Sequence, residues 1–384
     1  MIANIGNPTV VCFPFVGDVV GGSHISALNL IRRIDRDRYE PLVVLHQPAG
    51  AVARLFRDEG IGFEPAPTGG HLNGRGARRD LCALLADSWT LARFLRRRAV
   101  RIVHTNAGRS HATWALPTRL AGARQLWHHR KDPTAKGLRY LAPWAADRVV
   151  SVSRFSAPQP GPWSAAGRCD VVHSPFDTDR PPPDRQACRR TVTAALGVDP
   201  ATRIVAYFGS LVRRKRPVAF VEAVAALQAR APEVPLVAPL SGEDLEGLAG
   251  EVEARAAQLG VARQVRLMGF RYPPESWMAG SDLLLVTAVD EPFGRTLIEA
   301  MLLGTPVIAA DSGGNPEAIE DGRTGFLVAP DDIASFAARA AELLQDGARW
   351  RAISAAAQAD ARSRFGLERH AQAIMAIYDR MLRR

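Results

Sequence analysis

Long hydrophobic runs are missing from this 384-residue sequence: no apolar stretch reaches eighteen residues, so none is typical of a transmembrane helix. The N-terminal residues 1–8 have neither a basic start nor an apolar core, so we expect no secretory signal. Cysteine is scarce, and its four residues lie far apart without a CxxC pair, which argues against a disulfide framework or a zinc site. These absences predict a protein of the cytoplasm.

Lysine is also rare, with three residues, so arginine supplies most of the positive charge of a chain whose net charge is +10. Residues 1–183 hold 25 Lys and Arg against 14 Asp and Glu, whereas residues 184–384 hold 24 against 25. This excess favours an anionic or lipid-linked acceptor, or peripheral contact of the basic N-terminal half with the inner membrane face. An arginine-rich genome would produce the same excess without a partner. No recognition motif accompanies the arginines, so we expect no nucleic acid partner.

Short apolar runs alternate with amphipathic segments in both halves of the chain. Such alternation predicts parallel sheets covered by helices on both faces, an α/β architecture. We expect strands at 9–13, 41–45, 101–105, 125–128, 148–152, 204–208, 236–240, 265–268, 282–286, 307–310 and 325–328. We expect helices at 26–34, 88–98, 218–230, 243–259, 333–344 and 367–382.

A proline-dense stretch at 175–183 lies between the halves, and it can continue neither a strand nor a helix. We therefore predict two doubly wound domains, one over residues 1–180 and one over residues 181–366. The last helix, within residues 367–384, is expected to pack back on the first domain. Two such domains leave a cleft in which ligands bind at the carboxyl ends of the strands.

The segment at 290–301, with the sequence DEPFGRTLIEAM, joins an apolar strand to a helix that begins near Thr296. A turn with Pro and Gly leaves backbone N–H groups free at the helix N-terminus, where a diphosphate binds well. Glu291 in the loop and Glu299 in the first turn can accept hydrogen bonds from vicinal sugar hydroxyls. In a purely structural role, Glu299 would offset the helix dipole and Glu291 would be solvated.

Glu291 and Glu299, eight positions apart around Pro-Phe-Gly, resemble the E-x7-E motif of the retaining GT-B glycosyltransferases, the family 4-like enzymes also called glycosyl transferases group 1. The segments 300–309, 311–317 and 322–326 strengthen the resemblance, which is firmest over residues 200–330. It implies the GT-B fold, in which two Rossmann-like domains with parallel sheets face each other across a cleft. The N-terminal domain would bind the acceptor and the C-terminal domain the nucleotide-sugar.

The resemblance also implies roles for single residues on the donor side. Glu291 would contact hydroxyls of the donor sugar, and Glu299 the ribose. Backbone groups would face the sugar and phosphates from Phe293, Gly294, Arg295 and Thr296, and the nucleobase from Gly269, Phe270 and Arg271.

A basic turn at 213–216 follows the strand at 204–208, and it can neutralise a diphosphate leaving group without a metal. The same turn could simply be solvated. The resemblance matches Arg214 and Lys215 to the family's phosphate-binding pair, whereas Ser210 replaces an arginine that is frequent in the family. Two Asp-x-Asp triplets could in principle bind a metal with the donor. The triplet at 35–37 ends a helix and the triplet at 177–179 lies in the linker, so we predict no required metal and no other cofactor.

In the first half, paired glycines and histidines lie at expected strand ends. Gly21 and Gly22 resemble the glycine loop that reaches the donor phosphate or the acceptor in the family, although alone they would be a tight turn. The family also places a histidine near the sugar or acceptor, and either His128 or His129 would match it. His104 lies at another strand end, where a lone histidine is more often structural.

The segment 88–98 is a basic amphipathic helix that carries Trp89 and Phe94. It could lie on an anionic bilayer, but packing on the first sheet is the favoured interpretation because its apolar face is an ordinary stripe.

Together these features predict a metal-independent, retaining glycosyltransferase that acts by front-face transfer on a glycan, lipid-linked or cell-envelope precursor, as in polysaccharide biosynthesis. Two alternatives stay open on the same scaffold. One is a nucleotide-sugar epimerase or hydrolase, and the other is a non-catalytic sugar-nucleotide sensor or assembly protein.

Overall fold

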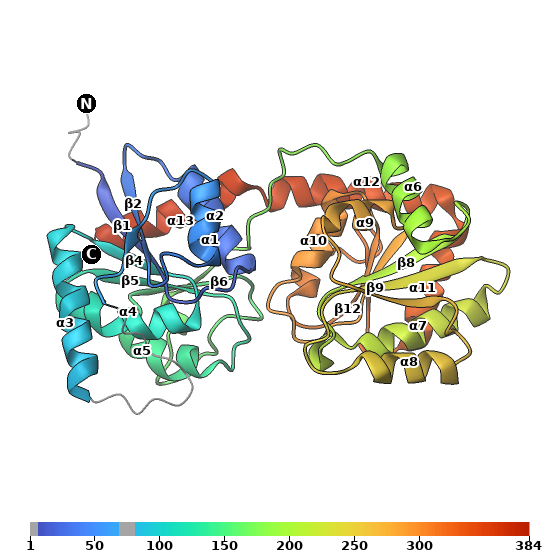
Figure 1. Cartoon of the computed structure of the whole chain (residues 1–384), viewed down its shortest axis with the longest axis horizontal. Coiled ribbons are helices and arrows are strands. Elements are labelled where there is room, and N and C mark those ends of the chain that lie inside the picture. The colour runs from blue at the N-terminus through green and yellow to red at the C-terminus, as the bar shows by residue number, and fades with distance from the viewer. Residues whose placement is uncertain (1–6, 69–80, 384) are drawn as a thin grey trace. The chain divides into compact units, whose positions relative to one another are not determined.

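The computed structural model describes residues 7–68 and 81–383, and it divides the chain into two compact units (Figure 1). Unit 1 comprises residues 1–175 and 367–384, and unit 2 comprises residues 176–366. Most of the segment 1–8, on which the expectation of no secretory signal rests, lies outside the described residues. Among the described helices, none is both long and apolar enough to cross a bilayer.

Unit 1 is built on a seven-stranded parallel sheet with the order β3-β2-β1-β4-β5-β6-β7. The order reverses beside β1, which lies between β2 and β4, so the carboxyl ends of these strands flank a switch point where ligands commonly bind. The strands are β1 (Thr9–Phe15), β2 (Tyr39–Leu45), β3 (Glu64–Pro65), β4 (Ile102–Thr105), β5 (Arg124–His129), β6 (Arg148–Ser151) and β7 (Cys169–Val171).

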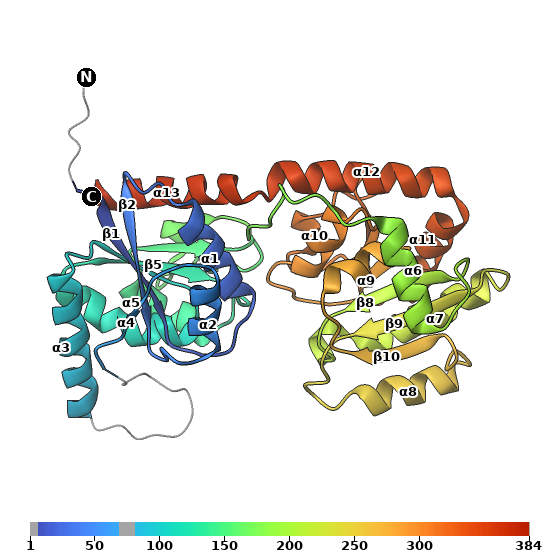
Figure 2. The same ribbon diagram turned by 45° about the horizontal axis from the view of Figure 1, so that its top comes forward.

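Helices cover both faces of this sheet (Figures 1 and 2). One face carries α1 (Gly22–Arg33), α2 (Ala51–Asp58) and the C-terminal helix α13 (Leu367–Leu382), whose apolar side chains share one core. The other face carries α3 (Leu81–Arg97), α4 (Gly108–Ala121), the π-helical turn η1 (Gly137–Leu141) and α5 (Ala142–Ala145). The helix α13 is held by the Tyr39 hydroxyl, which donates to the Asp379 carboxylate at 2.6 Å.

Unit 2 is built on a six-stranded parallel sheet with the order β10-β9-β8-β11-β12-β13. Here the order reverses beside β8, which lies between β9 and β11. The strands are β8 (Arg203–Phe208), β9 (Leu236–Ser241), β10 (Val265–Gly269), β11 (Leu283–Val286), β12 (Val307–Ala310) and β13 (Phe326–Val328). The helices are α6 (Arg185–Leu196), α7 (Pro217–Arg230), α8 (Ala249–Gln258), α9 (Pro274–Gly280), α10 (Arg295–Leu302), α11 (Ile333–Gln345) and α12 (Gly347–Arg364).

Several boundaries differ from the predictions. The helix expected at 243–259 begins at Ala249, because the Asp244 carboxylate accepts the backbone N–H groups of Leu248 and Ala249 at 2.8 and 3.0 Å and forms a turn. The helix expected at 88–98 spans Leu81–Arg97, and the one expected at 26–34 begins at Gly22. The helices α2, α4, α6 and α9 and the short strands β3 and β7 were not predicted.

The units meet in the chain at Pro175 and Phe176, not at residues 180 and 181. Phe176 belongs to unit 2 because its backbone N–H donates to the Phe365 carbonyl at 2.9 Å and the Arg295 guanidinium lies 4.4 Å from its ring centre. The proline-dense stretch therefore runs on after the boundary, within unit 2.

Candidate functional site

A charged cluster lies in unit 2 at the carboxyl ends of β8 and β11. The loop after β8 carries Arg214 and Lys215, and the loop after β11 carries Glu291. The Glu291 carboxylate forms an ion pair with Arg214, and its Oε1 lies 3.1 Å from Lys215 Nζ. Three residues that the sequence places in two loops more than seventy positions apart thus meet at the switch point of the sheet.

The charge state of Glu291 follows from its surroundings. Its side chain is 12% exposed, and burial alone would raise its pKa. The nearby Lys215 and Arg214 outweigh burial and hold the pKa of the Glu291 carboxyl below its usual value. The site therefore holds a buried, ionised carboxylate beside the largely buried ammonium group of Lys215 and the guanidinium of Arg214, whose side chain is 42% exposed.

Hydrogen bonds fix the cationic loop to the carboxylate loop. The Thr287 hydroxyl bonds to the carbonyls of Lys215 and Arg216 at 3.1 and 3.0 Å, and the Val289 N–H donates to the Arg214 carbonyl at 2.9 Å. These bonds set the positions of Arg214 and Lys215 relative to Glu291, so the cluster is held by its backbone as well as by charge.

The other two arginines of the basic turn have different surroundings. The Arg216 guanidinium donates to the Pro330 carbonyl at 2.7 Å and pairs with Asp331 at 2.6 Å, so it fastens the turn to the rest of unit 2. The Arg213 side chain is 76% exposed and lies 3.9 Å from Glu251. Arg213 is therefore a natural comparison residue for the paired cations beside it.

A second support for Glu291 comes from the segment after β12. The Gly314 N–H donates to the Glu291 carbonyl at 2.7 Å, and the Asp290 N–H donates to the Ser312 hydroxyl at 3.1 Å. A Cβ atom added at Gly313 would lie 2.5 Å from the Glu291 nitrogen, and Gly313 has φ +62°. The segment 311–317 therefore supports the backbone of Glu291, and we call it the brace. The residue pattern did not predict this role.

The cluster borders a small hollow in unit 2. Lys215 and Glu291 line it, together with Gly294 and Thr296 from the start of α10. A carboxylate, an ammonium group and the first turn of a helix therefore lie together with apolar side chains around this hollow. The further lining residues are Tyr207, Phe208, Leu285, Val286, Thr287, Ala288 and Leu297.

Two of the backbone groups expected to face the donor have other surroundings. The Arg295 N–H donates to the Phe293 carbonyl at 2.8 Å, and its contact with a donor stays a prediction. The Phe293 side chain is buried, and its ring packs edge-on against Phe365 at 5.7 Å. Gly294 precedes α10 directly, and a Cβ atom there would lie 2.8 Å from the Asn315 amide oxygen.

The second glutamate of the motif lies on α10. Glu299 pairs with Arg295, one turn earlier, at 3.3 Å, and its side chain is 37% exposed. The carboxylate is therefore available at the surface of α10, and its contact with a ribose stays a prediction.

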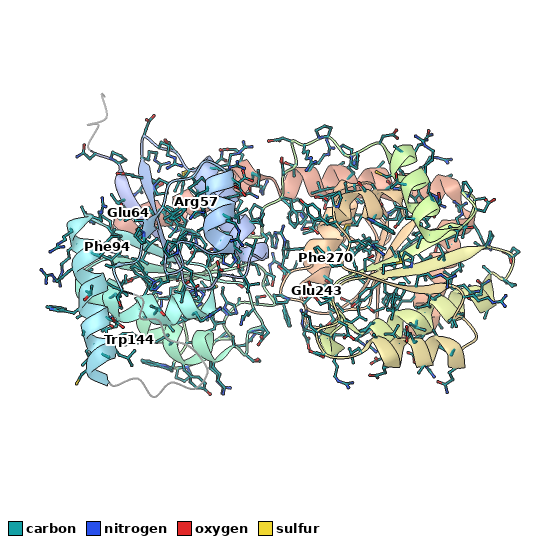
Figure 3. The ribbon with its side chains drawn as sticks, in the orientation of Figure 1. Arg57, Glu64, Phe94, Trp144, Glu243 and Phe270 are labelled. Atoms are coloured by element: carbon teal, nitrogen blue, oxygen red, sulfur yellow. The ribbon has the colours of Figure 1, made fainter. Side chains whose placement is uncertain are left out.

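Close backbone contacts join the ends of the neighbouring strands. The Gly242 N–H donates to the Gly269 carbonyl at 2.9 Å, and a Cβ atom at Gly242 would lie 2.0 Å from the Gly209 carbonyl oxygen. Beyond Gly269, the Phe270 side chain, labelled in Figure 3, is 66% exposed. Arg271 lies over the Trp277 ring. This edge presents an open aromatic ring beside backbone carbonyls, a surface suited to a nucleobase.

In unit 1, the predicted glycine loop leads into α1. Gly21 caps the helix, and its N–H donates to His24 Nδ1 at 3.3 Å, while Gly22 is the first helical residue. The preceding Val19 is 79% exposed. The loop thus presents backbone groups at the carboxyl end of β1, and its contact with a donor or acceptor stays a prediction.

The two candidate histidines lie inside unit 1 instead of at its surface. His128 is 0% and His129 is 4% exposed. His104 Nε2 lies 3.1 Å from His128 Nδ1, and His104 Nδ1 lies 2.6 Å from the Tyr378 hydroxyl of α13. His129 Nε2 bonds to the Asp132 carbonyl at 2.9 Å. The expectation that either His128 or His129 matches the family's histidine near the sugar or acceptor stays a prediction.

Burial also sets the charge of these imidazoles. It lowers the pKa of His104 and His128 well below the usual value, and the guanidinium of Arg130 adds to the effect. Both rings are therefore neutral at physiological pH. They form part of a buried polar network whose members lie far apart in the sequence and could not be predicted from it.

The predicted absence of a metal rests on the two Asp-x-Asp triplets. Asp35 accepts the Asp37 N–H at 3.0 Å, and Asp177 accepts the Asp179 N–H at 3.3 Å, so each first aspartate forms a local turn. Within residues 7–68 and 81–383, His, Cys, Asp and Glu do not gather in threes in a way that could hold a metal ion. Metal independence stays a prediction.

Comparisons with known proteins add to this geometry. Residues 189–360 match the sequence model of a family described as "Glycosyl transferases group 1". The alpha-maltose-1-phosphate synthase of Mycolicibacterium smegmatis is 33% identical over 300 residues, which are 70% of this chain and 74% of that protein. The lipopolysaccharide core biosynthesis mannosyltransferase LpsB of Rhizobium meliloti is 32% identical over 218 residues, 56% of this chain and 61% of that protein.

Other relatives are matched over less of their length. The alignments cover 46% to 49% of several proteins named D-inositol 3-phosphate glycosyltransferase, so the chain spans about half the length of these relatives. Among solved structures, Alr3699/HepE of Anabaena in complex with UDP and glucose superposes with a TM-score of 0.78. That match covers 97% of this chain and 99% of the other at 23% identity, which shows a shared fold.

Proposed function

The chain belongs to the glycosyl transferases group 1 family, and we propose that it transfers a sugar from a nucleotide-diphosphate donor to an acceptor, with retention of anomeric configuration and without a metal. Its fold is GT-B, as the sequence predicted, with two Rossmann-like parallel-sheet domains. The observation that carries the proposal is the cluster of Glu291, Arg214 and Lys215 at the switch point of the second sheet.

The cations of the cluster suit the leaving group. When the bond between the sugar C1 and the phosphate oxygen breaks, negative charge develops on that oxygen. Arg214 and Lys215 supply two positive charges beside that oxygen. Lys215, whose side chain is 19% exposed, is the better shielded of the two from bulk water, and such shielding strengthens electrostatic stabilisation. The start of α10 adds the partial positive charge of a helix N-terminus.

The surroundings of Glu291 favour binding of the donor sugar over nucleophilic attack on its C1. Its carboxylate is ionised, but it is engaged by two cations, which reduces its strength as a nucleophile. We therefore assign it to accepting hydrogen bonds from donor-sugar hydroxyls. In front-face transfer the acceptor oxygen bonds to C1 as the phosphate departs, and the acceptor proton passes to the departing phosphate oxygen.

The identity of the substrates is the finer part of the proposal. A structural neighbour was solved with UDP and glucose, which makes UDP-sugars the first donors to test. Relatives are named for lipopolysaccharide core, maltose 1-phosphate and inositol 3-phosphate, so an anionic glycan, lipid-linked or cell-envelope precursor is the acceptor class we propose. The reaction would take place in the cytoplasm.

Donor turnover tests the proposal. Purified protein is incubated with UDP-, GDP- and ADP-sugars, with and without a cell extract that supplies acceptors, and with EDTA. We expect nucleotide release that requires extract, persists in EDTA and falls about 100-fold in Glu291→Gln, the order of effect of losing one well-placed polar contact. Glu253→Gln on the exposed side of α8 is the matched control and should keep full turnover.

Other outcomes separate the alternatives. Release of nucleotide without extract would favour an epimerase or hydrolase. A shift of the melting temperature by a sugar nucleotide without any turnover would favour a sensor or assembly protein. Isolation of a peptide that carries a glycosyl ester on Glu291 would contradict front-face transfer.

A further inference from the structure

The positive charge of unit 1 is concentrated on one face of its sheet. Residues 81–147, which form α3, α4, η1, α5 and the strands between them, contain twelve Lys and Arg against three Asp. Residues 7–68 and 367–383, which include α1, α2 and α13 on the opposite face, contain nine Lys and Arg against nine Asp and Glu. The excess therefore belongs to the face covered by α3, α4, η1 and α5, which we call the α3–α5 face (Figure 2).

On this face α3 carries an unusual exposed stripe. Leu85 and Trp89, one helical turn apart, are 51% and 52% exposed, and the exposed Arg93 and Arg96 continue the same stripe. The second half of the helix, in contrast, packs into the core of unit 1 through Leu91, Leu95 and the half-buried Phe94. The first half of α3 thus presents apolar side chains to solvent, directly before a basic half.

Exposed aromatic rings on this face are each covered by an arginine. The Arg96 guanidinium lies 5.4 Å from the ring centre of Trp89, and that of Arg119 lies 5.1 Å from the ring centre of Trp144. Trp144, labelled in Figure 3, is 40% exposed. A third such pair, Arg139 over Tyr140 at 5.4 Å, follows on η1. Aromatic rings and guanidinium groups therefore occur together in pairs.

Hydrogen bonds join the helices that carry these pairs into one surface. The Arg96 guanidinium donates to the carbonyl of Leu120 on α4, and the Arg119 guanidinium of α4 donates to the carbonyl of Trp144 on α5 at 2.8 Å. The arginines thus bridge from α3 to α4 and from α4 to α5. The paired rings lie on a continuous and locally rigid surface.

We propose that the α3–α5 face binds the surface of an anionic bilayer. Tryptophan and tyrosine prefer the headgroup region, where the ring is in an apolar layer and its polar edge meets water. Arginines beside them meet anionic headgroups, and Leu85 supplies aliphatic surface that a bilayer accepts and a nucleic acid does not stack on. A second copy of the chain would bring the same positive face to itself and be repelled.

Vesicle flotation tests this inference without any donor or acceptor, so its outcome is separate from that of the proposed transfer. The protein is mixed with vesicles of phosphatidylcholine alone or with added phosphatidylglycerol. We expect flotation only with phosphatidylglycerol, and a loss of flotation at high salt. The double variant Arg96→Glu/Arg119→Glu should bind at least about 25-fold more weakly, or about five-fold for each arginine lost.

Matched variants distinguish the face from the overall charge. Arg33→Glu/Arg54→Glu makes the same charge change on α1 and α2 and should keep vesicle binding. Trp89→Phe/Trp144→Phe should lose most of the blue shift of tryptophan emission that vesicles induce, which also tests the face if the arginine variants fail to fold. Equal weakening by both double arginine variants, flotation with neutral vesicles, or displacement from vesicles by RNA would overturn the inference.

Discussion

The two units share a parallel-sheet architecture but treat ionisable groups at their strand ends in opposite ways. All nine histidines of the chain lie in the segments of unit 1, and residues 176–366 contain none. In unit 1, His104 and His128 are buried and neutral in a network that reaches Tyr378. In unit 2, Glu291 is nearly as buried but stays charged.

The difference teaches how a buried polar group is stabilised. A buried charge is costly unless it is paired, so unit 1 keeps its imidazoles neutral, with His104 hydrogen-bonded to both His128 and Tyr378. Unit 2 pairs its carboxylate with two cations. It thereby keeps charged groups at the place where we propose that negative charge develops on the leaving diphosphate. The first arrangement belongs to the interior of a folded unit, and the second is the one that we propose stabilises the reaction.

The largest expected effect is on the charged cluster. Lys215→Met removes one of the two cations, so we expect kcat/KM for the donor to fall about 100- to 1000-fold. Arg213→Met, at the exposed neighbouring arginine, should stay within a factor of about three, since an exposed ion pair contributes little. Steady-state kinetics of both variants measure the difference, and equal losses would show that the turn acts only through its overall charge.

Mild acid should separate the stabilities of the units. The folded-state pKa of His104 and His128 lies well below 6.5, and that of His370 is lowered by burial to about 3. Below pH 6.5 the unfolded chain binds protons that folded unit 1 does not, so unit 1 loses up to about 1.4 kcal/mol per pH unit for each such histidine.

Unit 2 loses stability in the same direction, but over a lower pH range. The pKa of Glu291 is lowered from 4.5, so its contribution is present above that pH and is lost only as the pH falls through the lower folded-state value. Limited proteolysis from pH 7 to pH 5, with fragments assigned to each unit, should therefore cut unit 1 first. Earlier cleavage in unit 2 would contradict the contrast between the units.

The brace behind Glu291 gives an intermediate effect. Gly313→Ala puts a methyl group against the Glu291 nitrogen at a positive φ, so we expect a cost of about 2–3 kcal/mol in unit 2 and weaker donor binding. Gly322→Ala has a similar φ of +72° but no heavy atom within 4 Å of its Cβ position, so it isolates the backbone cost. Equal losses of donor affinity in the two variants would exclude a specific brace.

Single hydroxyls give the smallest effects. Tyr378→Phe removes the bond to His104 and should cost unit 1 about 1 kcal/mol, and Tyr207→Phe removes the bond to the Ser210 carbonyl and should cost unit 2 a similar amount. Thermal unfolding followed separately in each unit measures this. Destabilisation of unit 2 by Tyr378→Phe would show that the network extends beyond unit 1.

Most strands and the two-unit division follow from local patterns, whereas the roles of Glu291, Arg214 and Lys215 were implied by the family resemblance. Alternating apolar runs mark the strands, and loops after neighbouring parallel strands must meet at one edge of the sheet. The pairing of His104 with Tyr378 could not be predicted, because 274 positions separate them and each alone fits an ordinary buried residue. The hydrogen bond from the Arg295 N–H to the Phe293 carbonyl could not be predicted either, because it depends on local turn geometry that no residue pattern encodes.

The central claim is that unit 2 holds the donor at the cluster of Glu291, Arg214 and Lys215. Hydrogen exchange with and without saturating UDP, GDP or ADP tests it most directly, because exchange maps binding without any need for an acceptor. We predict that one nucleotide slows exchange in segments 209–216 and 287–299, and that Lys215→Met abolishes this protection while Arg213→Met keeps it. Protection by a nucleotide in other segments alone, or unchanged protection in Lys215→Met, would contradict the claim.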